Sequence, residues 1–206
     1  MNQPLALQDR SCGRRSLSGV SVAGLLLAAG AGRRFGGPKA LAGGGLWLRR
    51  AVAVLVEGGC FPVRVVLGAR ADEAARLLPD PELAVIATDW RQGMSASLRA
   101  GLRAVDRLRP EPDAVLVHLV DLPDVTAEVV ARLVAGAGGP RMLARAVYGG
   151  RPGHPVLIGR AYWGDVVASV SGDAGARVWL DGRGDLVKVE CSDLAAGVDV
   201  DHPSGS

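Results

Sequence analysis

The stretch that decides the fold runs from residue 22 to residue 39 and reads VAGLLLAAGAGRRFGGPK. Its first part, 22–28, is a continuous apolar run, which is typical of a strand buried on both faces of a parallel sheet. The glycines that follow interrupt any helix, and they let backbone N–H groups approach an anion without a Cβ in the way. Arg34 and Lys39 add positive charge that suits phosphate groups. The stretch therefore predicts a buried strand followed by a phosphate-binding loop.

Apolar runs and helical patterns alternate along the rest of the chain. Helices are expected at 46–56, 71–78, 95–108, 126–134 and 160–180, and further strands at 62–67, 83–87, 114–120, 141–147, 155–158 and 186–190. Such alternation predicts a three-layer α/β/α fold with a mostly parallel central sheet. Ligands of these sheets bind beyond the carboxyl ends of the strands, so the chemistry is expected after 22–28 and after 114–120.

The composition fits one globular domain, since 49% of the 206 residues are hydrophobic and 22% are charged. We expect a single domain at 21–203 behind a disordered leader at 1–20, which lacks the apolar core of a signal peptide. No apolar run approaches the roughly 20 residues of a membrane span, and the aromatic content of 4% argues against single-strand binding. The three cysteines are far apart and form no zinc or redox motif. We therefore expect a cytoplasmic protein with no nucleic-acid or membrane partner.

Two common phosphate-binding motifs do not fit the glycine-rich stretch. A dinucleotide fingerprint would begin at Gly30-x-Gly32, but Arg-Arg-Phe occupies its third glycine position at 33–35. Gly-Gly-Pro at 36–38 blocks the helix that this fingerprint requires, and no acid follows the second expected strand. A P-loop needs Gly-x4-Gly-Lys-Ser/Thr, which is absent.

The stretch from Leu27 to Lys39 instead resembles the signature L-A-A-G-x3-R-x-G-x2-K of the molybdenum cofactor nucleotidyltransferases, the cytidylyltransferases and molybdopterin-guanine dinucleotide synthase-like enzymes with an NTP transferase domain. Every fixed position is filled. The resemblance extends to Asp201 and implies a Rossmann-like, GT-A-like nucleotidyltransferase fold. It implies catalytic roles for Arg34 and Lys39, which would hold the leaving pyrophosphate. The loop residues implied to bind the nucleotide are Leu27, Ala28, Ala29, Gly30, Gly32, Arg34 and Lys39.

A second segment, 92–98, resembles the family's G-M-x-x-S-L pattern and adds Gly93, Ser95 and Ser97 to the nucleotide-binding residues. The two hydroxyls stand at the start of an expected helix, where unpaired N–H groups favour an anion. Ser95 suits helix capping equally well.

The acids that follow the expected strands point to a metal ion. Asp121 comes directly after 114–120, and burying a carboxylate there is costly unless it meets a cation. The family has D-x-P here, which implies that Asp121 is catalytic and binds Mg²⁺, while Asp124 is assigned to the turn. Asp199 and Asp201 lie on one side of an extended segment that resembles the family's D-I-D-T-P. Either of them would complete the metal site, or both are solvated acids.

Two residues are expected beside the acceptor. His154 belongs to a segment resembling the family's G-H-P, and Arg177 follows a G-D-x-G-A segment whose Asp173 is a candidate helix cap. Thr126 is expected to cap the helix at 126–134. His118 interrupts an apolar strand and is expected to be a satisfied core residue.

The resemblance implies Mg²⁺-dependent transfer of a nucleoside monophosphate to a phosphorylated acceptor with release of pyrophosphate. In this family L-A-A-G accompanies cytidine and L-A-G-G guanosine, so Ala29 favours CTP over GTP and molybdopterin as the acceptor. Molybdoenzymes or their chaperones are then expected partners. A guanylyltransferase, a sugar-phosphate nucleotidyltransferase and a non-catalytic nucleotide-binding accessory protein stay open as alternatives. A glycosyltransferase would show D-x-D where 121–123 reads Asp-Leu-Pro.

Overall fold

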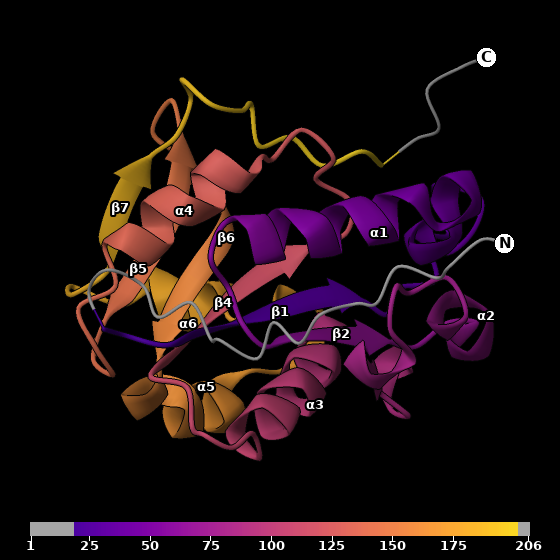
Figure 1. Ribbon diagram of the computed structural model, residues 1–206, viewed down its shortest axis with the longest axis horizontal. Coiled ribbons are helices and arrows are strands. Elements are labelled where there is room, and N and C mark those ends of the chain that lie inside the picture. The colour runs from indigo at the N-terminus through magenta and orange to yellow at the C-terminus, as the bar shows by residue number, and fades with distance from the viewer. Residues whose placement is uncertain (1–18, 202–206) are drawn as a thin grey trace, which may run out of the picture.

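The computed structural model describes residues 19–201, and a seven-stranded sheet lies at its centre (Figure 1). The strand order is β3-β2-β1-β4-β6-β5-β7. Only β6 runs antiparallel to its neighbours, β4 and β5. The strands are β1 (Val22–Ala28), β2 (Val63–Leu67), β3 (Ala84–Ile86), β4 (Ala114–Leu119), β5 (Leu143–Tyr148), β6 (Arg151–Gly159) and β7 (Val187–Glu190). The predicted mostly parallel sheet is confirmed.

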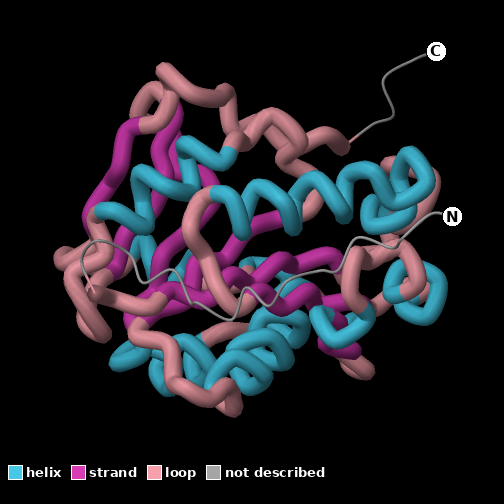
Figure 2. Tube along the Cα trace, in the orientation of Figure 1, coloured by secondary structure: helices cyan, strands magenta, loops and turns pink. Residues whose placement is uncertain are grey.

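Helices cover both faces of this sheet, which confirms the three-layer prediction (Figure 2). One face is covered by α1 (Ala42–Glu57), α2 (Ala71–Ala75) and α4 (Ala127–Ala135), and the other by α3 (Met94–Asp106), α5 (Trp163–Ser169) and α6 (Arg177–Asp181). Short 3₁₀ turns occur at Lys39–Leu41, Pro81–Leu83, Trp90–Gln92, Arg160–Tyr162 and Gly172–Ala174. The regular part of α1 begins at Leu46, as predicted, because the glycines at 43–45 have positive φ angles.

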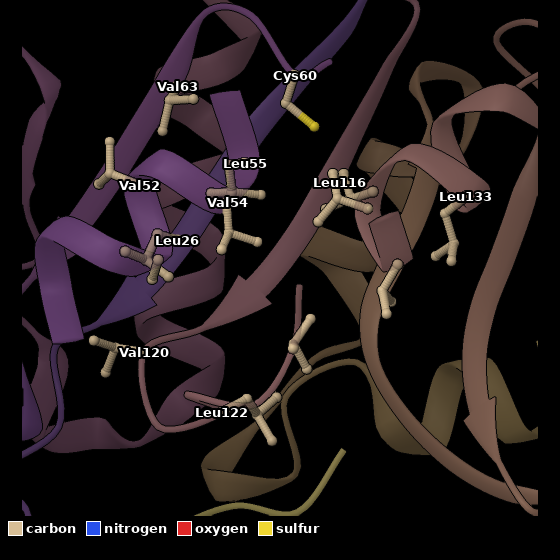
Figure 3. Packing of buried hydrophobic residues seen from close by; sticks show 14 of the residues in the cluster. Leu26, Val52, Val54, Leu55, Cys60, Val63, Leu116, Val120, Leu122 and Leu133 are labelled. Atoms are coloured by element: carbon tan, nitrogen blue, oxygen red, sulfur yellow. The ribbon is translucent and has the colours of Figure 1, made fainter. Parts of the chain in front are cut away.

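The central strand β1 is buried along its whole length, as its apolar sequence predicts. Its side chains alternate between the two faces. Leu26 packs in the same cluster as Val52 and Leu55 of α1 (Figure 3), whereas Leu25 faces α3. Gly101 lets α3 approach closely, since a Cβ there would lie 2.6 Å from the Leu25 side chain. Full burial of each such leucine contributes about 1.5–3 kcal/mol.

The predicted helix at 160–180 is wrong, because the segment is divided into a 3₁₀ turn, α5, a second 3₁₀ turn and α6. Gly172 and Gly175 have φ angles of 59° and 55°, a conformation that a helix cannot contain. The strand expected at 155–158 is longer than predicted, since β6 spans Arg151–Gly159. Gly149 and Gly150 form a two-residue hairpin connection with positive φ angles, so β6 begins at Arg151.

The expected leader at 1–20 lies almost entirely outside the described residues, as do the last two residues of the expected domain at 21–203. Cys60 and Cys191 are free and buried, and burial raises the pKa of the Cys60 thiol to about 12. Within residues 19–201, no helix is both long enough and apolar enough to cross a bilayer.

Candidate functional site

A cavity of about 800 Å³ opens at the carboxyl ends of β1 and β4, where the sequence predicts the chemistry. The loop after β1 and the segment after β4 form its centre. The turn before α3 closes one end, and the first residues of β6 together with the C-terminal segment close the other. The sequence-predicted residues that line it are Leu27, Ala28, Ala29, Gly30, Gly32, Arg34, Lys39, Gly93, Ser97, Asp121, His154, Asp199 and Asp201.

The loop after β1 folds into a tight turn around Gly32. The Gly32 carbonyl accepts hydrogen bonds from Phe35 N at 3.0 Å and Gly37 N at 3.1 Å. Gly32 has a φ angle of 58°, and a Cβ at this position would overlap the Gly37 carbonyl. The Phe35 ring packs against Trp47 of α1, with centroids 5.2 Å apart. The loop is therefore a preformed cradle, and glycine is required at residue 32.

Lys39 joins this loop to the end of β4. Its Nζ lies 2.9 Å from Asp121 Oδ2 and 2.9 Å from Asp201 Oδ1, and its side chain is only 12% exposed. Burial lowers the pKa of Lys39, but the hydrogen bonds and charges of the two carboxylates outweigh burial, and the net shift is upward. Arg34 Nη1 contacts the other oxygen of Asp201 at 3.1 Å. The two cations of the loop thus share one carboxylate in the cavity.

The C-terminal segment is tied to the end of β4 by backbone contacts. Val200 N donates to the Asp121 carbonyl at 3.0 Å. Asp124 Oδ2 accepts from Ala196 N at 2.9 Å and from Gly197 N at 2.8 Å. Asp124, which the sequence assigns to the turn alone, therefore anchors the segment that carries Asp199 and Asp201. Its partners lie more than 70 residues away along the chain, so no local pattern reveals this role.

The donor set at Asp121 fits a divalent cation. Asp121 Oδ1 is buried and has no hydrogen-bond partner within residues 19–201. Mg²⁺ prefers such oxygens and usually takes one or two carboxylates together with substrate phosphates and water. Among the described residues, however, no three His, Cys, Asp or Glu side chains form a group that could hold a metal, and Lys39 stands between Asp121 and Asp201. The set of Asp121, Asp199 and Asp201 stays a prediction.

An aromatic residue that the sequence reasoning missed, Trp90, lines the end of the cavity next to β2 and β3. A Cβ at Gly68 would lie 2.5 Å from Trp90 Cγ and 2.7 Å from the Ala29 carbonyl, which itself accepts Ala69 N at 3.0 Å. The guanidinium carbon of Arg91 stands 4.7 Å from the Trp90 ring centroid. Trp90 and the Ala29 carbonyl therefore both pack closely against Gly68.

The start of α3 separates the two predicted serines. Ser97 lines the cavity, whereas Ser95 does not, and Ser95 Oγ is buried without a hydrogen-bond partner in the described part of the chain. The capping alternative for Ser95 is wrong, because Gly93 is the N-cap residue and no side chain caps the helix. The Asp173 carboxylate occupies the space that a Gly93 Cβ would need, and Asp173 lines the cavity.

Of two further capping predictions, that for Asp173 is wrong and that for Thr126 is confirmed in position only. Ala176, not Asp173, is the N-cap residue of α6, and it makes no side-chain capping bond. Thr126 is the N-cap residue of α4, but its hydroxyl makes no capping hydrogen bond. Both helices are held by their packing against the sheet instead.

The end of the cavity beside β6 is formed by Pro152, Gly153 and His154. Burial, and next the charge of Arg145, lower the pKa of His154 to about 4, so its imidazole is neutral at physiological pH. His118 is buried in β4 as predicted, but its Nδ1 lacks a partner within residues 19–201, so it is not fully satisfied. Arg177 lies outside the cavity lining, is 76% exposed and pairs with Asp181 at 3.6 Å.

Comparisons with known proteins agree with this geometry. The MobA-like NTP transferase domain matches residues 24–189. Nicotine blue oxidoreductase from Paenarthrobacter nicotinovorans is 40% identical over 192 residues, which cover 87% of this chain and 92% of that protein.

Solved structures superpose over most of the chain. The homolog of Mycobacterium tuberculosis Rv0371c from Mycobacterium sp. strain JC1 has a TM-score of 0.73 at 31% identity, covering 88% of this chain and 90% of its own. A manganese complex of Rv0371c from Mycobacterium tuberculosis H37Rv shares the fold, with a TM-score of 0.69 at 24% identity and coverages of 88% and 94%. The phosphate loop, the acid after β4 and the domain match over residues 24–189 together establish that this chain belongs to the MobA-like NTP transferase domain family.

Proposed function

We propose that this protein transfers CMP from CTP to a phosphorylated acceptor, molybdopterin, in a Mg²⁺-dependent reaction that releases pyrophosphate. The observation that carries the proposal is the contact between Lys39 and Asp121, because it brings the glycine-rich loop and the carboxylate proposed to bind the metal to one point in the cavity. The family supplies the reaction class, nucleotidyl transfer. The nucleotide, the metal and the acceptor are our proposal.

In the proposed reaction, a phosphate oxygen of the acceptor attacks the α-phosphorus of CTP. The bond from the α-phosphorus to the bridging oxygen breaks, and pyrophosphate leaves with the electron pair. Such transfers depend on positioning and charge neutralisation more than on a side-chain nucleophile. The loop amides around Gly32, with Arg34 and Lys39, would hold the leaving group. These two cations must exchange their present carboxylate partner, Asp201, for phosphate oxygens.

Asp121 would hold the divalent ion through Oδ1, the oxygen that has no partner in the described chain. When bound, Mg²⁺ neutralises the charge that builds on the α-phosphate. Oδ2 of Asp121 already contacts Lys39, so one carboxylate would serve the cation of the loop and the metal together.

Selection of cytidine would depend on Ala29. Ala29 is buried and lines the cavity, and its carbonyl is fixed by Ala69 N next to the Trp90 ring. Compared with a glycine, the methyl group of Ala29 would leave less room for the base. A smaller pyrimidine fits such a narrowed site better than a purine.

The test is pyrophosphate release with Mg²⁺, measured for CTP, GTP, ATP and UTP separately, with and without molybdopterin. Release that needs both CTP and molybdopterin supports the proposal, and release with GTP alone would make the protein a guanylyltransferase. Asp165→Asn is the matched control for Asp121→Asn, because Asp165 is an exposed carboxylate on α5, outside the cavity lining. No release with any triphosphate, alongside tight binding of one of them, would indicate an accessory nucleotide-binding protein.

A second candidate function is oxidoreduction of nicotine blue or a related compound, for which we would supply a reduced nicotinamide nucleotide as the electron donor. The identity of 40% to nicotine blue oxidoreductase favours it, although 30–36 does not carry the usual dinucleotide fingerprint. The same protein preparation is tested for oxidation of NADH and NADPH in the presence of nicotine blue. Turnover there, without pyrophosphate release from any triphosphate, would replace the proposed function.

A further inference from the structure

The end of the cavity beside β6 is built on an irregularity between β5 and β6. Arg145 pairs with Val156, and Val147 pairs with Pro152. Between these two pairs β5 has one residue, 146, whereas β6 has three, 153–155, and the register shifts. The extra residues leave the regular ladder of hydrogen bonds, as in a β-bulge. His154 lies within this bulge and lines the cavity.

Two side chains of β5 bind the carbonyl groups of the bulge. Arg145 Nε donates to the Gly153 carbonyl at 3.0 Å, and the Tyr148 hydroxyl donates to the His154 carbonyl at 2.7 Å. Consecutive carbonyls of a regular strand point to opposite sides, yet these two are both bound from β5. Arg145 is 7% exposed and Tyr148 3% exposed, so both bonds are at least partly shielded from water. The path of the backbone on either side of the His154 side chain is thereby fixed.

The Tyr148 ring also fills the space beside two glycines. A Cβ at Gly153 would lie 2.7 Å from Tyr148 Cε2, and a Cβ at Gly197 would overlap the ring. Gly197 belongs to the C-terminal segment that carries Asp199 and Asp201. Tyr148 therefore holds the bulge and this segment at fixed positions relative to each other.

Arg145 is an expensive residue to bury for structural purposes alone. Its ion pair is a 3.4 Å contact with Asp181, which is 52% exposed and also pairs with Arg177. Burial lowers the pKa of Arg145, which reflects the cost of keeping its charge away from water. An apolar side chain of similar length would fill the same space without the free-energy cost of removing a charge from water. A buried cation beneath a cavity end instead suits a site that receives an anionic ligand.

We propose that Arg145 and Tyr148 are positioning residues for the acceptor: by binding the Gly153 and His154 carbonyls they hold His154 at the acceptor end of the cavity. This inference rests on the proposed function, and on the G-H-P resemblance at His154, which implies that the phosphorylated acceptor binds at this end. Arg145 and Tyr148 act through His154 and the bulge and are absent from the cavity lining.

The first test follows the His154 imidazole by NMR as a function of pH, which does not depend on any activity. The charged and titratable groups around it are Arg145, His118 and Tyr148, and the signal is assigned with His154→Gln. In the wild type we expect a midpoint near pH 4, because burial and the charge of Arg145 lower the pKa of His154 to about 4. Arg145→Met is expected to raise this midpoint toward the ordinary histidine value, and Tyr148→Phe to shift the imidazole signals.

Arg99→Met is the matched control, because Arg99 also donates to a backbone carbonyl, that of Val170 at 2.9 Å, but this carbonyl lies at the end of α5 and not in the bulge. It is expected to leave the His154 signals as in the wild type. Tyr148→Phe removes one hydroxyl and keeps the ring, and Arg145→Lys keeps the charge. These two variants keep the test informative should Arg145→Met fail to fold.

The second test measures steady-state kinetics. Loss of the hydrogen bond from Arg145 or of that from Tyr148 is expected to raise the KM for the acceptor by about tenfold, which corresponds to about 1.4 kcal/mol. The KM for CTP is expected to stay unchanged. Arg145→Lys should recover part of the loss. Wild-type His154 signals together with a wild-type acceptor KM in Arg145→Met and Tyr148→Phe would overturn the inference while leaving the proposed function intact. Altered His154 signals without turnover of any acceptor would support the positioning of His154 and refute the proposed function.

Discussion

Lys39 Nζ lies 2.9 Å from Asp121 Oδ2, so the cation that ends the phosphate loop meets the carboxylate that follows β4. The two residues are 82 positions apart, and they meet because β1 and β4 pair in parallel and end at the same edge of the sheet. Both side chains are mostly shielded from water, at 12% and 22% exposed. The pair therefore fixes the loop before any nucleotide arrives, which lowers the cost of ordering it on binding.

Lys39→Met should weaken CTP binding and slow turnover. The change removes a positive charge from the leaving group and leaves Asp121 without its cation. Loss of one such charge-stabilising group typically costs about 100-fold or more in kcat. Steady-state pyrophosphate release measures this, with Lys188→Met on the exposed strand β7 as the control. Equal kcat values for both variants would show that Lys39 has no part in the reaction.

Gly32→Ala should impair the phosphate loop without unfolding the domain. A Cβ at residue 32 overlaps the Gly37 carbonyl, and the φ angle of 58° disfavours any other residue. Gly37→Ala is the matched control in the same loop, because a Cβ there meets nothing within 4 Å. We expect the dissociation constant for CTP, measured by calorimetry, to rise at least about tenfold in Gly32→Ala alone. Identical affinities in the two variants would contradict a preformed loop.

The two serines at the start of α3 should respond differently to substitution. Ser97→Ala removes a hydroxyl that lines the cavity and should raise the KM for CTP. Ser95→Ala removes a buried hydroxyl that has no partner within residues 19–201, so it should leave kinetics unchanged and leave stability unchanged or slightly higher. Melting temperature and KM are measured for both. A larger kinetic effect from Ser95→Ala would reverse this assignment.

The free energy of unfolding should fall as the pH is lowered from about 6.5 toward 4. Burial lowers the pKa of His118 to about 3, and burial with the charge of Arg145 lowers that of His154 to about 4. In this window the unfolded chain binds protons that the folded chain excludes, so stability is lost with acid. At about 1.4 kcal/mol per pKa unit, the loss is a few kcal/mol.

His118→Leu tests the origin of this pH dependence. The substitution removes the group with the larger shift, and His118 Nδ1 has no partner in the described chain that would be left unpaired. The pH dependence from denaturant titrations should become shallower, with little loss of stability at pH 7. An unchanged slope between pH 6.5 and 4 would mean that His118 does not carry the effect.

The features that could be predicted from the sequence are those for which the residue pattern of a single segment is sufficient. The apolar run at 22–28 is buried throughout, and the loop that follows it carries Arg34 and Lys39 into the cavity, as their spacing indicates. Asp121 could be predicted as a site residue because it follows the buried strand β4, where a carboxylate is costly unless it meets a cation. Each of these predictions needs only the local sequence pattern and the rule that the carboxyl ends of parallel strands lie at the same edge of a sheet.

The features that could not be predicted depend on contacts between distant segments. Asp124 binds Ala196 N and Gly197 N, and Trp90 packs on Gly68, and neither pairing leaves a local signal. The bulge around His154 arises from the register of two strands. The broken helix at 160–180 is different, since Gly172 and Gly175 signal the break within an otherwise helical spacing of apolar residues.

The central claim is transfer of the CMP group of CTP to an acceptor at a site organised by Asp121. The most direct measurement incubates the protein with Mg²⁺, molybdopterin and CTP labelled at the α-phosphorus, and follows the label and pyrophosphate together. We predict one labelled molybdopterin dinucleotide for each pyrophosphate released, and a loss of at least about 100-fold in Asp121→Asn. Label that remains in CTP, or transfer that is as fast in Asp121→Asn as in the wild type, would contradict the account.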